Sequence, residues 1–82
     1  MKKYSAKKIE KEILDIASKV LKVKKSKLSL KSSTKNLLEW DSLNHVNLMI
    51  ELKRNFNLNF KISEVSEINN LNQWHKLIIK KY

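Results

Sequence analysis

The chain contains neither glycine nor proline among its 82 residues. Tight β-hairpins depend on glycine, because their turn residues adopt positive φ angles that a Cβ atom disfavours. The absence of both residues therefore argues against a hairpin-rich sheet and favours helices that are joined by polar segments. It also excludes the glycine-rich loops that bind nucleotide phosphates.

Hydrophobic periodicity predicts an all-α bundle of four helices, three main and one short, in a single domain over residues 1–82. The first helix is expected over residues 5–22, where Ser5 is a suitable N-cap residue. Its apolar residues recur at helical spacing: Ile9, Ile13, Ile16, Ala17 and Val20. This stripe predicts one buried face against the rest of the bundle.

The second helix is expected over residues 42–56, directly after Asp41, which is a favourable N-cap residue. It contains more apolar residues than one narrow stripe can hold: Leu43, Val46, Leu48, Met49, Ile50, Leu52 and Phe56. We therefore expect a central helix that is buried on most sides.

Two joints flank the second helix. Residues 23–40 form a long polar loop, whose leucines are expected to anchor it on the core: Leu28, Leu30, Leu37 and Leu38. After the helix, Leu58, Phe60 and Ile62 alternate with polar residues, and we expect an extended segment with these three side chains pointing inward.

Two helices complete the predicted bundle. The short one is expected over residues 63–68, with Ser63 as its cap. The last begins after Asn70, because Asn70 and Gln73 have the spacing of a capping box. Its apolar face contains Leu71, Trp74, Leu77 and Ile78. We expect the Trp74 ring to lie in the core with its indole N–H at the edge.

The net charge is +10, from 18 basic and 8 acidic residues, and most of the excess lies in residues 1–31, with 11 lysines and 3 acids. A basic segment can attract nucleic acid or anionic membranes. A basic helical nucleic-acid-binding domain, or a protein-interaction domain without a prosthetic group, is therefore an alternative function. A solvated lysine face is favoured over it, because interleaved aromatic residues and arginines are missing and Arg54 is the one arginine. We expect no nucleic-acid partner.

Cysteine is absent from the sequence, which excludes disulfides and thiolate metal ligands. No apolar stretch approaches the roughly 18 residues of a membrane span. The basic N-terminus is not followed by the apolar core of a signal peptide. We therefore expect a cytoplasmic protein with no membrane span and no metal site.

The tetrapeptide Trp40-Asp41-Ser42-Leu43 places a serine at the predicted start of the second helix. Free backbone N–H groups and the positive end of the helix dipole favour an anion at such a position. Ser42 is therefore a good acceptor for a phosphodiester. The alternative is that it only caps the helix.

These residues resemble the phosphopantetheine-attachment family of acyl and peptidyl carrier proteins. The resemblance rests on Asp41-Ser42-Leu43, then an apolar helix, the joint Phe56-Asn57-Leu58-Asn59-Phe60, a short helix and a closing helix. It covers nearly the whole chain, from about Ile9 to Ile79.

The resemblance implies a four-helix bundle in which Ser42 carries 4′-phosphopantetheine. A phosphopantetheinyl transferase would install this arm from coenzyme A, and the terminal thiol would hold an acyl or aminoacyl group as a thioester. Asp41 would cap the helix and help to orient the metal and coenzyme A of the transferase. The other implied partners are the enzymes that load and transfer the group. The carrier itself would be a monomer that catalyses no reaction.

The chain departs from the fatty-acid carriers, which have a glycine segment where Glu39-Trp40 stands and are strongly acidic along their second helix. Asn44, Asn47 and Lys53 occupy the corresponding positions here. The resemblance is therefore closer to stand-alone carriers dedicated to one biosynthetic cluster. Partner enzymes are expected to contact residues around the start of the second helix: Trp40, Leu43, Val46, Met49 and Glu51.

A hydrolytic Ser42–His45 pair is another interpretation, because residues i and i+3 share a helix face. It is disfavoured, since no orienting acid or oxyanion site is evident. We instead expect His45 to be exposed beside the arm.

Overall fold

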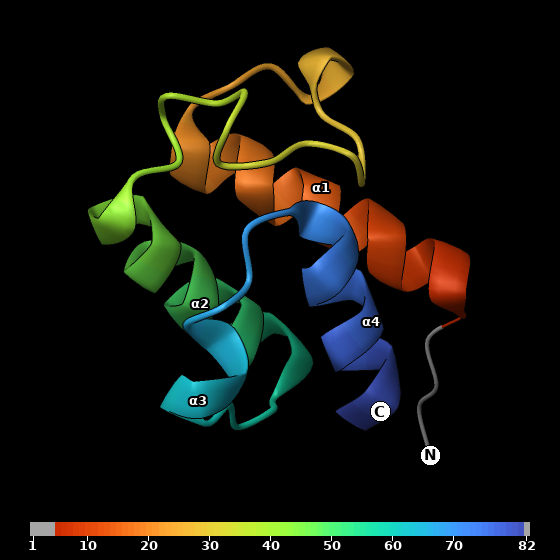
Figure 1. Cartoon of the computed structure of the whole chain (residues 1–82). Coiled ribbons are helices and arrows are strands. Elements are labelled where there is room, and N and C mark those ends of the chain that lie inside the picture. The colour runs from red at the N-terminus through yellow and green to blue at the C-terminus, as the bar shows by residue number, and fades with distance from the viewer. Residues whose placement is uncertain (1–4, 82) are drawn as a thin grey trace.

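The computed structural model describes residues 5–81 and confirms the all-α fold (Figure 1). Its four α-helices are α1 (Ala6–Leu21), α2 (Ser42–Phe56), α3 (Ile62–Val65) and α4 (Leu71–Lys81). A short 3₁₀ turn, η1 (Lys25–Lys27), interrupts the long first loop. No helix within the described residues has the length and apolar content that crossing a bilayer requires.

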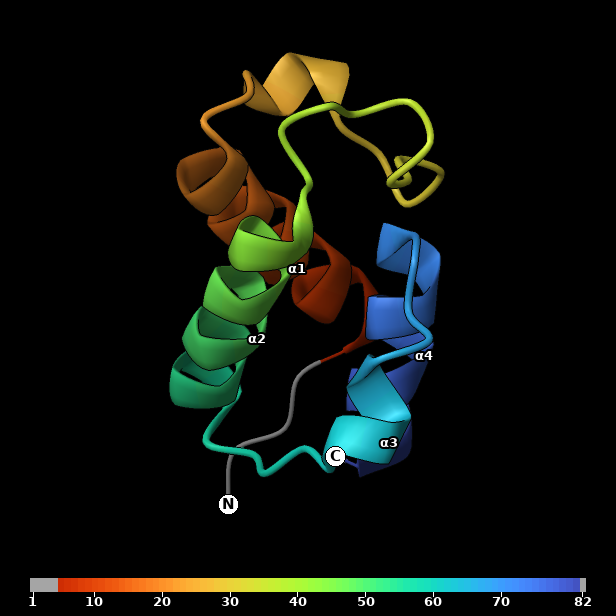
Figure 2. The same ribbon diagram turned by 60° about the vertical axis from the view of Figure 1, so that its left-hand side comes forward.

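The three main helices meet around one core. α1 packs against both α2 and α4, as Figures 1 and 2 show from two directions. The first loop runs from the end of α1 through η1 and returns to the start of α2. It is attached to the start of α4 by an isolated antiparallel bridge between Ser33 and Asn70.

The core is formed by one face of each main helix. α1 contributes Ile9, Ile13, Ala17 and Leu21. α2 contributes Leu48, Leu52 and Phe56, and α4 contributes Leu71, Trp74 and Ile78. Each set repeats at intervals of three or four residues, so the buried faces follow the helical period.

Trp74 lies deeper in this core than the sequence predicts. Its side chain is fully buried, and its indole N–H has no hydrogen-bond partner among the described residues. The expectation that this N–H reaches the edge of the core is therefore wrong. The ring packs edge-on against Phe60, at a centroid distance of 5.3 Å, so aromatic packing fixes its orientation.

The burial of α2 differs from the prediction. Its exposed apolar residues are Leu43, Val46 and Ile50, which retain 69%, 47% and 42% of their accessible surface. They lie at positions i, i+3 and i+7, and thus on one face, opposite the face that enters the core. α2 is therefore buried on one side only, because no described element covers its outer face.

Two further burial expectations are wrong. Leu38 is 95% exposed and does not anchor the first loop, whereas Leu28 is buried and Leu30 and Leu37 pack against the core. Ile62 is 79% exposed, because it is the first residue of α3 and projects away from the bundle.

α3 also begins earlier than predicted, and Ser63 is not its cap. The Glu64 carboxylate accepts a hydrogen bond from the Lys61 backbone N–H at 2.8 Å, which sets the helix start at Ile62. The same carboxylate pairs with the Lys81 ammonium at 3.0 Å and so ties α3 to the end of α4. The Lys61 N–H and the Lys81 ammonium hold the pKa of Glu64 below its usual range.

The caps of the main helices follow the sequence signals. The Ser5 and Asp41 side chains accept hydrogen bonds from the backbone of the first turns of α1 and α2. Asn70 accepts one from the Gln73 N–H at 2.8 Å, while the Gln73 side chain accepts from Asn69 rather than Asn70. A polar side chain thus satisfies one of the exposed N–H groups at each start.

The C-terminal ends of α1 and α2 show how the chain manages without glycine. Lys22 and Asn57 follow these helices with φ angles of 57° and 54°, in the left-handed region. Their backbone N–H groups donate to the carbonyl oxygens of Ser18 and Lys53. Glycine normally takes this position, because a Cβ atom disfavours it.

Candidate functional site

Ser42 is the first residue of α2, and its side chain is exposed. The preceding residue, Asp41, has the extended backbone of an N-cap, with φ −94° and ψ −176°. Its Oδ1 atom accepts a hydrogen bond from the Asn44 backbone N–H at 2.9 Å. The hydroxyl of Ser42 therefore lies at the surface on a capped helix end, where the helix dipole favours a negative group.

The chain before Ser42 is fixed to the helix that follows it. The Asn44 side-chain amide donates to the Glu39 carbonyl oxygen at 2.8 Å. The Trp40 backbone N–H donates to the Leu37 carbonyl oxygen at 3.1 Å. We call residues 39–45 the Ser42 turn. Side chains from α2 reach back across this turn, so it is a defined structure and not a loose loop end.

The side chains of Trp40 and His45 contact each other on the inner side of the Ser42 turn. The Trp40 side chain is only 3% exposed, and its Nε1–H donates to His45 Nδ1 at 3.0 Å. The two rings are stacked, with centroids 6.0 Å apart. On the other side, His45 Nε2 lies 2.8 Å from the carbonyl oxygen of Val65 at the end of α3.

Two site expectations therefore need correction. Trp40 does not offer its ring to a partner, because the ring is buried against His45. His45 is not exposed beside an arm, because its ring lies partly buried between Trp40 and α3. Both side chains hold the turn in place and do not form its surface.

Both ring nitrogens of His45 have hydrogen-bond partners, which argues against the hydrolytic Ser42–His45 pair. A general base would need a free ring nitrogen directed at the Ser42 hydroxyl. Trp40 and the Val65 carbonyl group occupy both nitrogens of His45. His45 is therefore not available as a base for Ser42, although the two residues lie three positions apart on one helix. Within residues 5–81, no group of three or more His, Cys, Asp or Glu side chains is placed to hold a metal ion.

The surface that runs from Ser42 along the outer face of α2 is apolar. Leu43, Val46 and Ile50 form what we call the α2 strip, which starts next to Ser42 and runs along the outer face of the helix. Met49, by contrast, is half-buried against the core. Ile50 was not among the residues selected from the sequence, because periodicity alone assigned it to the buried side of a central helix.

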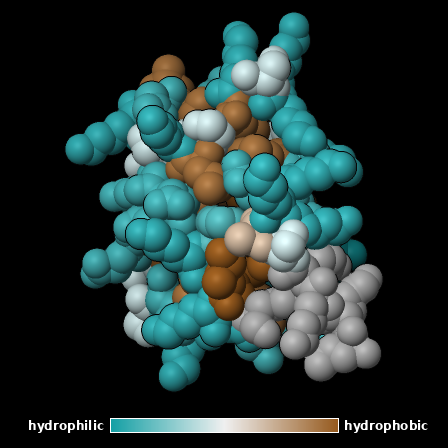
Figure 3. All heavy atoms as spheres, turned by 90° about the vertical axis from the view of Figure 1, so that its right-hand side faces the viewer, coloured by the Kyte–Doolittle hydropathy of each residue, from teal (hydrophilic) through white to brown (hydrophobic). Residues whose placement is uncertain are grey.

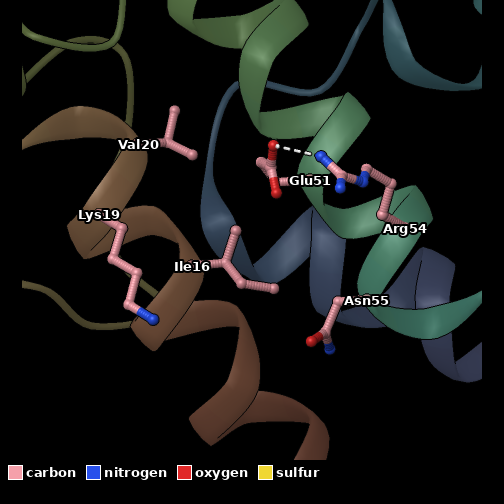
Figure 4. Close-up of a pocket in the computed structure, with 6 residues that line it drawn as sticks. All are labelled: Ile16, Lys19, Val20, Glu51, Arg54 and Asn55. Atoms are coloured by element: carbon pink, nitrogen blue, oxygen red, sulfur yellow. Dashed lines mark hydrogen bonds and ion pairs between the residues drawn. The ribbon is translucent and has the colours of Figure 1, made fainter.

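Glu51 lies on a different side of α2 from the α2 strip. Its carboxylate pairs with Arg54 at 3.4 Å and lines an open cavity of about 600 Å³ between α1 and α2 (Figure 4). The cavity is lined from α1 by Ile16, Lys19 and Val20, and from α2 by Glu51, Arg54 and Asn55. Glu51 is nine residues from Ser42, about 13 Å along the helix at about 1.5 Å per residue. The cavity is therefore separate from the Ser42 turn.

Comparison of the chain with protein-family models and with curated proteins finds no match. The chemistry of the Ser42 turn is therefore inferred from its residues and their geometry.

Proposed function

We propose that the chain is a carrier protein whose Ser42 bears 4′-phosphopantetheine and presents acyl or aminoacyl groups as thioesters. In the modification, the Ser42 hydroxyl oxygen attacks the phosphorus of coenzyme A that bears the pantetheine. A phosphodiester forms, the hydroxyl proton is lost, and adenosine 3′,5′-bisphosphate leaves. A phosphopantetheinyl transferase would catalyse this step, because both ring nitrogens of His45 are engaged elsewhere and do not activate the Ser42 hydroxyl.

The observation that carries the proposal is the placement of Ser42. An arm that visits several active sites has to start at the surface, and a transferase has to find its serine in a fixed position. Ser42 meets both requirements, since it is exposed on the first turn of α2 while Asp41, Asn44 and Trp40 hold that turn. The phosphodiester would also lie at the positive end of the helix dipole.

Other features of the chain are consistent with a carrier. It has no cysteine, so the thiol of the arm would supply all of its thioester chemistry. The α2 strip offers apolar contact area next to the attachment point, and such exposed patches commonly form interaction surfaces. We propose that the transferase and the loading and transferring enzymes dock there, on a monomer in the cytoplasm, where coenzyme A is the donor.

The proposal is tested by intact-mass measurement after incubation with coenzyme A and a broad-specificity phosphopantetheinyl transferase. We expect the native chain to gain one phosphopantetheine and Ser42→Ala to gain none. Ser63→Ala is the matched control, because Ser63 is also exposed in the first turn of a helix, and this variant should be modified like the native chain.

Failure of the native chain to gain mass, with folding shown by circular dichroism and an active transferase, would contradict the proposal. The chain would then be better described as an interaction domain without a prosthetic group. Equal modification of Ser42→Ala and the native chain would show that another residue is the acceptor.

A further inference from the structure

His45 joins three segments of the fold around the Ser42 turn. Its Nδ1 atom accepts the hydrogen bond from the Trp40 indole, and its Nε2 atom faces the Val65 carbonyl oxygen. An indole N–H can only donate and a carbonyl oxygen can only accept. The ring is therefore neutral, with its proton on Nε2, when both hydrogen bonds are made.

We propose that His45 is a positioning residue for Ser42, which holds the turn through Trp40 while its ring is neutral and releases Trp40 when the ring is protonated. The inference rests on the proposed carrier function. Ser42 lies between Trp40 and His45 in the chain, so the bond between their side chains closes a short loop around it. The second hydrogen bond, to Val65, fixes this loop to α3.

Protonation acts on one of the two hydrogen bonds. A proton on Nδ1 places an N–H group opposite the Trp40 N–H, and two donors repel each other. Trp40 is 3% exposed, so its N–H cannot turn to water without movement of the ring. Loss of a buried partner is costly for a polar group. The bond from Nε2 to Val65 survives, because Nε2 keeps its proton in the charged ring.

Other titratable side chains border the residues that contact the ring. They come from the loop before α2, from α3 and from α4: Glu39, Asp41, Glu64 and His75. Three of them have partners away from the His45 ring. The Asp41 carboxylate accepts from the Asn44 N–H, and the Glu64 carboxylate accepts from the Lys61 N–H and pairs with the Lys81 ammonium. His75 Nε2 lies 2.8 Å from the Ala6 carbonyl oxygen. The groups that contact the His45 ring are uncharged: the Trp40 and Trp74 rings and the Val65 carbonyl group.

The first test compares initial rates of phosphopantetheine transfer to Ser42 for the native chain and for His45→Asn. The asparagine side-chain oxygen can accept from Trp40 and does not titrate. Dividing the two rates at each pH removes the pH dependence of the transferase. From about pH 7.5 to about pH 5.5, where histidine side chains commonly charge, the ratio should fall roughly two- to tenfold, the range of one hydrogen bond.

His75→Asn is the matched control for this experiment. His75 is also a partly buried histidine with a backbone carbonyl partner, but it joins α4 to α1. The rate of this variant should follow the native pH profile. Two results would overturn the inference. One is a rate ratio between the native chain and His45→Asn that does not change with pH. The other is a pH profile for His75→Asn that matches the profile of His45→Asn.

The second test does not depend on modification. The indole N–H resonances of Trp40 and Trp74 are followed by NMR between the same pH values and assigned with Trp40→Phe. The Trp40 signal should shift in one step in the native chain and stay fixed in His45→Asn. A Trp40 signal that does not respond to pH in the native chain would overturn the role of His45.

The two tests separate the possible failures. If the chain is not modified at any pH by an active transferase, the carrier proposal and the positioning role fall together, whatever the indole signals do. If the chain is modified and the rate ratio is flat, the role of His45 alone is wrong.

Discussion

Asp41 caps α2, and a pair of substitutions can separate this role from the role proposed for its carboxylate at the transferase. Asp41→Ala removes the cap from the Asn44 N–H and should destabilise the protein by about 1 kcal/mol, the usual effect of losing an N-cap. Asp41→Asn keeps a capping oxygen, so its stability should stay near that of the native chain. Urea unfolding followed by circular dichroism measures both.

The modification assay then isolates the charge of Asp41. If the carboxylate assists the transferase, Asp41→Asn should remain folded and accept phosphopantetheine more slowly. Equal unfolding midpoints for Asp41→Ala and the native chain would show that the hydrogen bond to Asn44 contributes nothing to stability.

In the candidate site, some residues could be selected from the sequence and the roles of others could not. Ser42 and Asp41 were selected because an N-cap signal and the tripeptide Asp41-Ser42-Leu43 are local features of the sequence. The roles of Trp40 and His45 were missed, because the Val65 carbonyl group that completes their arrangement lies 20 residues beyond His45. A tryptophan and a histidine that flank Asp-Ser-Leu were the available signal, but the second partner of the histidine comes from α3.

At the scale of elements, an ion pair links α1 to the first loop. The Lys25 ammonium of η1 contacts the Asp15 carboxylate of α1. The hydrogen bond from Lys25, together with its charge, holds the pKa of Asp15 below its ordinary value of 3.8. The unfolded chain therefore takes up this proton at a higher pH than the folded one. The stability that the pair contributes is present above the ordinary value and is lost as the pH falls through the lower, folded value.

Asp15→Asn should accordingly lower the unfolding midpoint in urea at neutral pH and have little effect well below pH 3.8. Both side chains are more than two-fifths exposed, so solvent screening limits the effect to about 1 kcal/mol or less. Glu10→Gln serves as a control, because Glu10 has no ion-pair partner within residues 5–81. A difference between Asp15→Asn and the native chain that persists unchanged in acid would contradict this assignment.

The elements differ in how well the sequence predicted them. The bounds of α2, residues 42–56, are as expected, because an N-cap and a long apolar period define them. Its exposed outer face was not foreseen, since periodicity shows that residues share a face but not whether another element covers that face. α3 was misplaced because the start of a one-turn helix depends on few contacts, here the hydrogen bond that the Lys61 backbone N–H donates to the Glu64 carboxylate.

At the scale of the whole molecule, the charge of +10 is spread over a small surface. The described part of the chain has a radius of gyration of 11.7 Å, so its lysines lie within a few Debye lengths of one another at low salt. On the face seen in Figure 3, hydrophilic side chains project around smaller apolar areas. Mutual repulsion of these charges opposes the compact state.

Sodium chloride should therefore stabilise the protein. Raising its concentration from about 0.02 M to about 0.5 M shortens the Debye length from about 20 Å to about 4 Å and should raise the urea midpoint. A midpoint that stays constant or falls would show that attractive pairs such as Asp15–Lys25 outweigh the repulsion. A chloride salt is used because sulfate also strengthens apolar burial.

The left-handed residues that end α1 and α2 have a consequence for how this protein can change over generations. In this conformation a Cβ atom costs about 1 kcal/mol, and asparagine tolerates it better than lysine, so most of the cost falls on Lys22. A glycine at position 22 would recover that stability from outside the Ser42 turn. A lineage that altered the α2 strip, and lost stability in doing so, would thus have a one-step remedy elsewhere. Because the chain has no glycine at this position, a stabilising substitution is still available to it.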